Sequence, residues 1–213
     1  MHYYAESDGH VFLVKHGDLW TLPTEQELPF AHQVVAPLPT TPQSLFVVPS
    51  LSRHPADWPC KDDLPQRTDV SPLVKHAVHA TMPRVVVEAV CRDTEGKILV
   101  VKSSRGLSKD RWSLPGGFLR YGESPEDGVR REIGEELGCG CVVGRLIRSV
   151  GRIGSKVPFH WIMLFYQVDL TAEPIHDPDE IAEICWLHAP EAALYLGDGL
   201  MQRVVEEVVR TEE

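Results

Sequence analysis

Apolar positions in the first part of the chain come in short runs that are separated by prolines. Runs at residues 11–14, 34–35 and 45–48 are typical of short strands, and residues 1–83 hold 11 of the 17 prolines but only two of the 16 glycines. This pattern predicts a small, proline-rich, mostly β domain or extension over residues 1–83, in which residues 57–83 serve partly as a linker. No motif in it indicates chemistry, so a packing or dimerisation element and a direct substrate-binding role both stay open.

From residue 84 onward, runs typical of strands alternate with stripes typical of helices. We expect strands at residues 85–91, 98–102, 141–150, 159–168 and 184–187, with the end of a further strand at 112–117. Helices are expected at residues 125–137, 190–196 and 200–209. Strands interspersed with helices predict an α/β domain over residues 84–213.

The helix expected at residues 125–137 has a start signal and a stop signal. Ser124 suits the N-cap position, and Pro125 suits the first helical position. Gly138 is able to adopt the left-handed conformation that closes many helices. Local signals therefore predict both ends of this helix.

Three carboxylates share one face of the same helix, because Glu132, Glu135 and Glu136 lie at positions i, i+3 and i+4. Like charges at this spacing destabilise a helix by about 0.2–0.5 kcal/mol per pair. The interior Gly128 and Gly134 cost about 1 kcal/mol each relative to alanine. A solvated acidic face does not explain these penalties, whereas a cation site does, because Mg²⁺ prefers carboxylate and phosphate oxygens. The three glutamates are therefore candidate metal ligands.

The segment GFLRYGESPEDGVRREIGEELGC, residues 117–139, resembles the Nudix box. Its fixed positions are Gly117, Glu123 and the run at residues 131–139; the last one usually carries an aliphatic residue and here holds Cys139, which packs as a small hydrophobe. The resemblance implies a complete Nudix domain over residues 84–213. The fold class expected from it is α/β, a Nudix-like α/β/α sandwich with a mixed β-sheet, preceded by the small mostly-β N-terminal domain or extension.

The activity that the resemblance implies is metal-dependent hydrolysis of a pyrophosphate bond in a nucleoside diphosphate linked to another group X. Glu132, Glu135 and Glu136 are implied to hold Mg²⁺ or Mn²⁺, with Glu132 and Glu136 as the strongest candidates. Arg131 and Glu123 are implied to form a supporting pair that orients the helix and its carboxylates. The substrate stays open among ADP-ribose-like compounds, dinucleoside polyphosphates, nucleotide sugars and modified nucleoside triphosphates.

This chemistry also requires a general base that accepts the proton of the attacking water. The acidic stretch at residues 177–183 precedes a predicted strand, and Glu180 within it is our candidate, either as the base or as an additional metal ligand. A plain solvated loop acid is an equally compatible interpretation.

Two groups of residues are candidates for substrate binding. The backbone of Gly116 and Gly117 has no side chain that would keep a metal or phosphate at a distance. Arg152 and Lys156 precede the aromatic run at residues 159–161, so cations lie near side chains able to stack on a base. The alternative for this second group is an ordinary surface hairpin.

Charge and composition limit the partners. The formal charge of −10 argues against a general nucleic-acid binder, because phosphate backbones are held by clustered Lys and Arg, so we expect a small-molecule nucleotide as partner. No apolar run approaches the roughly 20 residues that cross a bilayer, and no signal peptide is recognised, so a cytoplasmic protein is expected. The five cysteines include no C-x-x-C pair, which favours reduced thiols.

A second class of function is a Nudix-like domain that binds a nucleotide as a non-catalytic sensor or scaffold. Loss of box glutamates would favour it, and none is lost here. Oligomeric state is not readable from the sequence, and a homodimer formed through residues 1–83 stays open by analogy alone.

Overall fold

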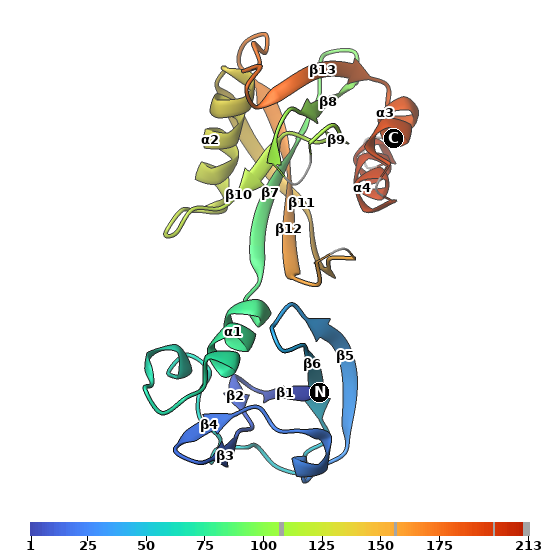
Figure 1. Cartoon of the computed structure of the whole chain (residues 1–213). Coiled ribbons are helices and arrows are strands. Elements are labelled where there is room, and N and C mark those ends of the chain that lie inside the picture. Colours follow the sequence, from blue (N-terminus) through green and yellow to red (C-terminus); the bar gives the residue numbers. More distant parts are fainter. Residues whose placement is uncertain (107–108, 156, 198, 211–213) are drawn as a thin grey trace. The chain divides into compact units, whose positions relative to one another are not determined.

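The computed structural model describes residues 1–106, 109–155, 157–197 and 199–210 (Figure 1). The chain divides into two compact units. The first unit contains Met1–Arg84 together with Arg152–Trp161, and the second contains Val85–Gly151 together with Ile162–Glu213.

The first unit is built mainly from short strands. A four-stranded sheet has the order β2-β1-β6-β5 and consists of β1 (His2–Ser7), β2 (His10–Val11), β5 (His32–Leu38) and β6 (Ser44–Pro49). In it β1 and β6 run parallel, and the other pairs are antiparallel. A hairpin of β3 (Val14–His16) and β4 (Leu19–Thr21), two 3₁₀ turns (Glu25–Glu27 and Leu64–Gln66) and one α-helix complete this unit.

That helix, α1 (Pro72–Thr81), lies in the range that we expected to serve partly as a linker. The hydroxyl of Ser71 accepts a hydrogen bond from the Val74 N–H, and Pro72 occupies the first position, so α1 has a well-formed N-terminus. Its buried side chains join Tyr4, Leu22 and Leu64 in a common core. The segment before residue 84 is therefore part of a packed structure.

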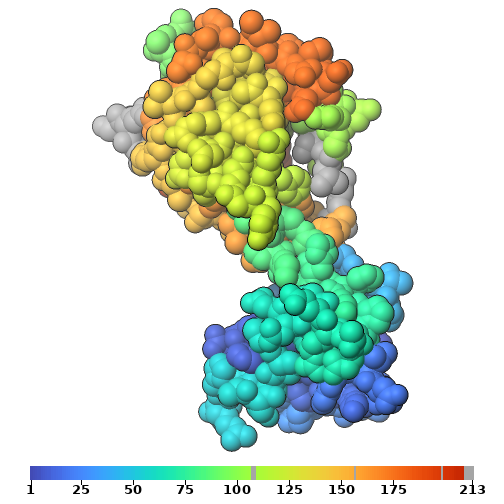
Figure 2. Space-filling model, turned by 90° about the vertical axis from the view of Figure 1, so that its left-hand side faces the viewer, coloured from blue at the N-terminus to red at the C-terminus, as the bar shows by residue number. Residues whose placement is uncertain are grey.

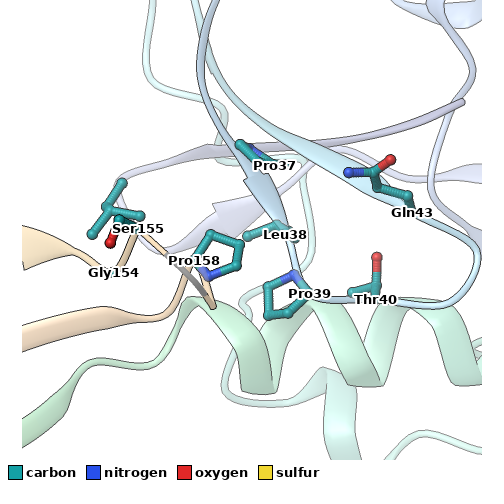
Figure 3. A pocket seen from close by; sticks show the side chains of 9 residues that line it. Pro37, Leu38, Pro39, Thr40, Gln43, Gly154, Ser155 and Pro158 are labelled. Carbon is teal, nitrogen blue, oxygen red and sulfur yellow. The ribbon is translucent and has the colours of Figure 1, made fainter.

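The first unit also contains a pocket of about 500 Å³ (Figure 3). Residues 37–40 and Gln43 line one part of it, and residues 153–155 and Pro158 line another. None of these lining residues is charged. The pocket therefore lacks the groups that acid–base or metal chemistry requires.

The second unit contains two sheets and three helices. One sheet has the order β10-β7-β12-β11 and consists of β7 (Arg84–Cys91), β10 (Gly116–Phe118), β11 (Cys141–Ile153) and β12 (His160–Leu170). Of these strands, Arg84 and the residues at 152–153 and 160–161 are assigned to the first unit. The other has the order β13-β8-β9 and consists of β8 (Ile98–Ser103), β9 (Trp112–Ser113) and β13 (Ile181–Leu187). The helices are α2 (Pro125–Leu137), α3 (Ala189–Leu196) and α4 (Gly199–Arg210).

Helices cover the strands of the second unit from different sides (Figure 1). Val129, Ile133 and Leu137 of α2 pack with buried residues of β7, β8 and β12 in one core. On α4, Met201, Val204, Val205 and Val208 are buried, and their spacing places them on one apolar face of the helix. Among the described residues, no helix is long and apolar enough to cross a membrane.

Candidate active site

The helix α2 spans the residues that the sequence predicted. The Ser124 hydroxyl accepts a hydrogen bond from the Asp127 N–H at 3.3 Å and donates one to Asp127 Oδ2 at 2.7 Å. Gly138 ends the helix with a left-handed φ of 60°. The burial of Val129, Ile133 and Leu137 turns the opposite face outward, and in Figure 2 the yellow-green atoms of α2 and of the loop before it form much of the face that is visible.

The two interior glycines of α2 have different surroundings. A Cβ on Gly128 would lie 2.3 Å from Leu119 Cδ2, so this glycine lets the loop before α2 pack closely on the helix. A Cβ on Gly134 would meet no atom within 4 Å. Packing therefore explains the first glycine, and nothing in the structure explains the second.

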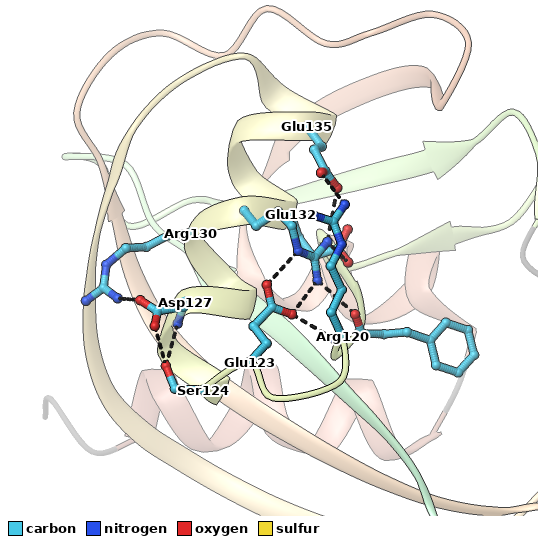
Figure 4. Close-up of polar contacts among 9 residues, drawn as sticks. Arg120, Glu123, Ser124, Asp127, Arg130, Glu132 and Glu135 are labelled. Atoms are coloured by element: carbon cyan, nitrogen blue, oxygen red, sulfur yellow. Dashed lines mark hydrogen bonds and ion pairs between the residues drawn. The ribbon is translucent and has the colours of Figure 1, made fainter.

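Arg131 joins the helix to the loop before it through Glu123, which is labelled in Figure 4. Its Nε donates to Glu123 Oε1 at 2.7 Å, and its Nη2 donates to Glu123 Oε2 at 2.8 Å and to the Phe118 carbonyl at 2.9 Å. Hydrogen bonds from Arg131 and from the Arg120 N–H lower the pKa of Glu123 to about 2. This bidentate pair fixes the position at which α2 presents its acidic face.

The same guanidinium contacts two of the candidate metal ligands. Arg131 Nη1 donates to Glu132 Oε1 at 2.7 Å and to Glu135 Oε2 at 3.0 Å. The other oxygen of Glu135, Oε1, accepts a hydrogen bond from Arg120 Nη2 at 2.8 Å. Both oxygens of Glu135 are thus engaged by arginines (Figure 4).

Glu136 faces the strand that precedes the loop. Its Oε2 accepts a hydrogen bond from the Gly116 N–H at 3.0 Å. Burial raises the pKa of Glu136 to about 8, and the charges of Glu132, Glu180 and Glu135 contribute to this rise against the lowering effect of the Gly116 bond. Burial also raises the pKa of Glu132, against the lowering effect of Arg131. The acidic groups therefore repel one another when no cation is present.

Gly116 lies where a side chain has no room, and a side chain at Gly117 would displace the Glu132 carboxylate. A Cβ on Gly117 would lie 2.5 Å from Glu132 Oε1, and a Cβ on Gly116, whose φ is 150°, would lie 2.1 Å from the Val87 carbonyl oxygen. Glycine at these positions allows β10 to run directly beside the carboxylates of α2. Their contact with a substrate stays a prediction.

Glu180 lies in the turn that leads into β13. Its backbone carbonyl accepts a hydrogen bond from the Ser104 N–H at 2.8 Å, and its carboxylate forms an ion pair with Arg105. Because its charge contributes to the raised pKa of both Glu132 and Glu136, Glu180 belongs to the same electrostatic cluster. Its role as a base stays a prediction.

The sequence suggested two basic residues for substrate binding, Arg152 and Lys156. Arg152 is exposed at the end of β11 and belongs to the first unit, whereas the acidic cluster belongs to the second. Lys156 lies outside the described residues.

Sequence reasoning missed two arginines of this site, Arg120 and Arg105. Arg120 occupies a spacer position of the box, where residue type is free, and its partner Glu135 lies 15 residues away. Arg105 is 75 residues from Glu180. No local signal in the sequence indicates either pair.

A divalent metal fits the chemistry of this cluster. Carboxylate oxygens are the donors that Mg²⁺ and Mn²⁺ prefer, and burial together with the neighbouring acids disfavours the charged form of Glu136, a cost that a bound cation would offset. In the conformation that the structure describes, however, residues 1–106, 109–155, 157–197 and 199–210 hold no group of three or more His, Cys, Asp or Glu placed to bind an ion. In this conformation Glu132 accepts a hydrogen bond from Arg131, and Glu135 accepts hydrogen bonds from Arg131 and Arg120.

Residues 82–208 match the family of the NUDIX domain. The chain belongs to the Nudix family. The resemblance of residues 117–139 to the Nudix box is thereby confirmed, and the carboxylates of α2, Arg131 and Gly116–Gly117 lie inside the matched region.

Proteins of similar sequence support this family assignment. An ADP-ribose pyrophosphatase of Methanocaldococcus jannaschii is 41% identical over 101 residues, which cover 47% of this chain and 59% of that protein. The nucleoside triphosphatase NudI of Salmonella paratyphi B is 28% identical over 141 residues, which cover 61% of this chain and 87% of that protein. A mycobacterial relative is matched over only 42% of its length.

Solved structures resemble the Nudix part of the chain. A MutT protein from Methanosarcina mazei has a TM-score of 0.55 at 23% identity and covers 62% of this chain and 97% of that chain. A Nudix hydrolase from Nitrosomonas europaea has a TM-score of 0.53 at 22% identity and covers 61% and 90%. At these identities the likeness concerns the fold alone, and it confirms the predicted fold class.

Proposed function

We propose that this chain is a metal-dependent Nudix hydrolase that cleaves a pyrophosphate bond in a nucleoside diphosphate linked to another group X. Residues 84–213 are assigned as the catalytic domain and residues 1–83 as a separate N-terminal domain. The observation that carries the proposal is the cluster of Glu132, Glu135 and Glu136 on one face of α2, next to the glycine strand β10.

The residues of the cluster have separate tasks. Glu132, Glu135 and Glu136 hold Mg²⁺ or Mn²⁺, which when bound offsets the charge of the phosphates and makes the attacking water more acidic. Arg131 and Glu123 hold α2 against its preceding loop, so the carboxylates keep their positions. Gly116 and Gly117 allow β10 to run beside the carboxylates, and their backbone is a candidate contact to the phosphates.

Glu180 is the candidate general base. Its charge contributes to the raised pKa of Glu132 and of Glu136, which supports this candidate. In this role its carboxylate takes the proton of the water that attacks phosphorus. Arg152 and Lys156 stay candidate phosphate contacts on the basis of the sequence alone.

The names of the similar proteins suggest an order in which to test the candidate substrates. ADP-ribose-like compounds come first, because the relative that is 41% identical is an ADP-ribose pyrophosphatase. Nucleoside triphosphates come next, because of the similarity to NudI. Dinucleoside polyphosphates and nucleotide sugars complete the set.

A substrate panel tests the proposal. Each compound class is incubated with the full chain, with and without Mg²⁺, and a coupled phosphatase converts the products to free phosphate. Metal-dependent cleavage of one class, absent in Glu136→Gln, is the expected result. If no compound in the panel is cleaved and a nucleotide binds tightly in a thermal-shift assay, the non-catalytic sensor or scaffold is favoured instead.

A further inference from the structure

Arg120 holds one oxygen of a candidate metal ligand. It lies in the loop between β10 and α2, and its Nη2 donates to Glu135 Oε1 at 2.8 Å (Figure 4). Its own backbone N–H donates to Glu123 Oε2 at 2.8 Å, and Glu123 is in turn fixed by Arg131. The backbone of Arg120 is therefore held in place, while its guanidinium reaches across to the acidic face of α2.

The two arginines on Glu135 differ in how firmly they are held. Arg131 has a side chain that is only 14% exposed, and it also binds Glu123, Glu132 and the Phe118 carbonyl. The Arg120 side chain is 64% exposed, and within the part of the chain that the structure describes Glu135 is its one ion-pair partner. Of the two, Arg120 is the one that a competing cation displaces at low cost, because exposed ion pairs are weak.

We propose that Arg120 competes with the divalent metal for Glu135, so that metal binding displaces its guanidinium and the residue thereby sets the metal affinity of the site. This inference rests on the proposed function, which makes Glu135 a metal ligand. A carboxylate oxygen that accepts a charged hydrogen bond from a guanidinium is a poorer donor to a second cation, because the two positive charges repel each other. Arg120 is a positioning residue in this scheme, because it acts on the metal through Glu135.

The test measures Mn²⁺ binding to the full chain by isothermal titration calorimetry, without any substrate. Arg120→Gln removes the competitor and is expected to tighten Mn²⁺ binding about twofold to fivefold, the range that the strength of an exposed ion pair allows. Arg130→Gln is the matched control. Arg130 also forms a 2.8 Å ion pair, with Asp127 on α2, and its side chain is 51% exposed, so its removal is expected to leave the affinity unchanged within error.

A second background separates competition from a general charge effect. Glu135→Gln removes the carboxylate for which the arginine and the metal compete, and it is expected to weaken Mn²⁺ binding. If Arg120 acts through Glu135, Arg120→Gln changes nothing further in that background. If Arg120→Gln tightens binding equally with and without Glu135, its effect is long-range charge and the inference is overturned.

The outcomes also separate this inference from the proposed function. A wild-type chain that binds no Mn²⁺ overturns the metal site and the competition together. A wild-type chain that binds Mn²⁺, with Arg120→Gln and Arg130→Gln indistinguishable from it, overturns the competition alone. Circular dichroism on every variant verifies that the fold is retained.

Discussion

The helices α1 and α2 have similar N-termini but different roles in the molecule. Each has a serine N-cap followed by proline, Ser71 before α1 and Ser124 before α2, and each cap accepts a hydrogen bond from the N–H three residues on. The helix α1 packs into the core of the first unit through four buried residues, Val74, Ala77, Val78 and Ala80. Its first turn contains no acidic residue. In α2 the apolar stripe occupies one side, and the acidic cluster occupies another.

The difference shows how a helix carries clustered like charge and stays in place. Each of the three clustered carboxylates accepts at least one hydrogen bond: Glu132 from Arg131, Glu135 from arginines at both oxygens, and Glu136 from the Gly116 N–H. No such partners are needed on α1. A comparison of matched substitutions in the two helices separates what serves stability from what serves chemistry.

The largest expected effect is the loss of activity in Glu136→Gln. The substitution replaces a carboxylate that can ionise and bind a cation with a neutral amide of almost the same volume, so the fold is kept, while kcat on the substrate found in the panel is expected to fall at least about 100-fold. Steady-state kinetics measures this. Glu126→Gln, an exposed acid of the same helix that accepts a hydrogen bond from the Tyr166 hydroxyl, is expected to retain kcat, and an equal loss in both variants would contradict a specific role for Glu136.

The core stripes of the two helices are expected to matter for stability in both units. Ile133 of α2 and Val78 of α1 are both fully buried. Ile133→Ala is expected to lower the free energy of unfolding by about 2–4 kcal/mol, and Val78→Ala by about 2 kcal/mol, because each leaves a cavity. Urea denaturation with peptide-resolved hydrogen exchange shows which unit opens; a neutral Val78→Ala would mean that α1 is not part of a cooperative core.

The two N-caps are expected to be equivalent despite the different helices. Ser71→Ala and Ser124→Ala each remove one acceptor for a first-turn N–H, so each is expected to lower the free energy of unfolding by about 1 kcal/mol. Thermal unfolding of the two variants, with the wild type measured alongside, tests this. A cost at Ser124 several times that at Ser71 would show that the cap of α2 also supports the loop that carries Arg120.

The smallest expected effect is a gain in stability at Gly134. An added Cβ there meets no atom, so Gly134→Ala is expected to raise the free energy of unfolding by about 0.5–1 kcal/mol. Gly128→Ala brings the same helix propensity but forces Leu119 to move, so it is expected to give no gain. The urea midpoints of unfolding of the two variants measure these changes in stability. An equal increase in both variants would show that the Leu119 side chain moves aside without an energetic cost.

Much of α2 was predictable because its signals are local. The serine cap, the proline and the closing glycine lie within a few residues of the helix ends, and the i, i+3, i+4 spacing alone places the three glutamates on one face. By contrast, the sequence analysis did not predict α1, which lies in a proline-rich segment. The apolar residues of α1 pack against residues far away in the chain, such as Tyr4 and Leu22, and local sequence patterns do not show these contacts. The parallel pairing of β1 with β6 likewise joins strands that are far apart in the chain.

The family, the ends of α2 and the face that carries its carboxylates follow from the amino-acid sequence, because each depends on residues that are neighbours along the chain. Which arginines pair with those carboxylates depends on the folded structure. Arg120 reaches Glu135 from the loop before α2, and Arg105 reaches Glu180 from a distant loop. Ion pairs form between groups that folding brings together in space, and the spacing of residues in a sequence does not encode that distance.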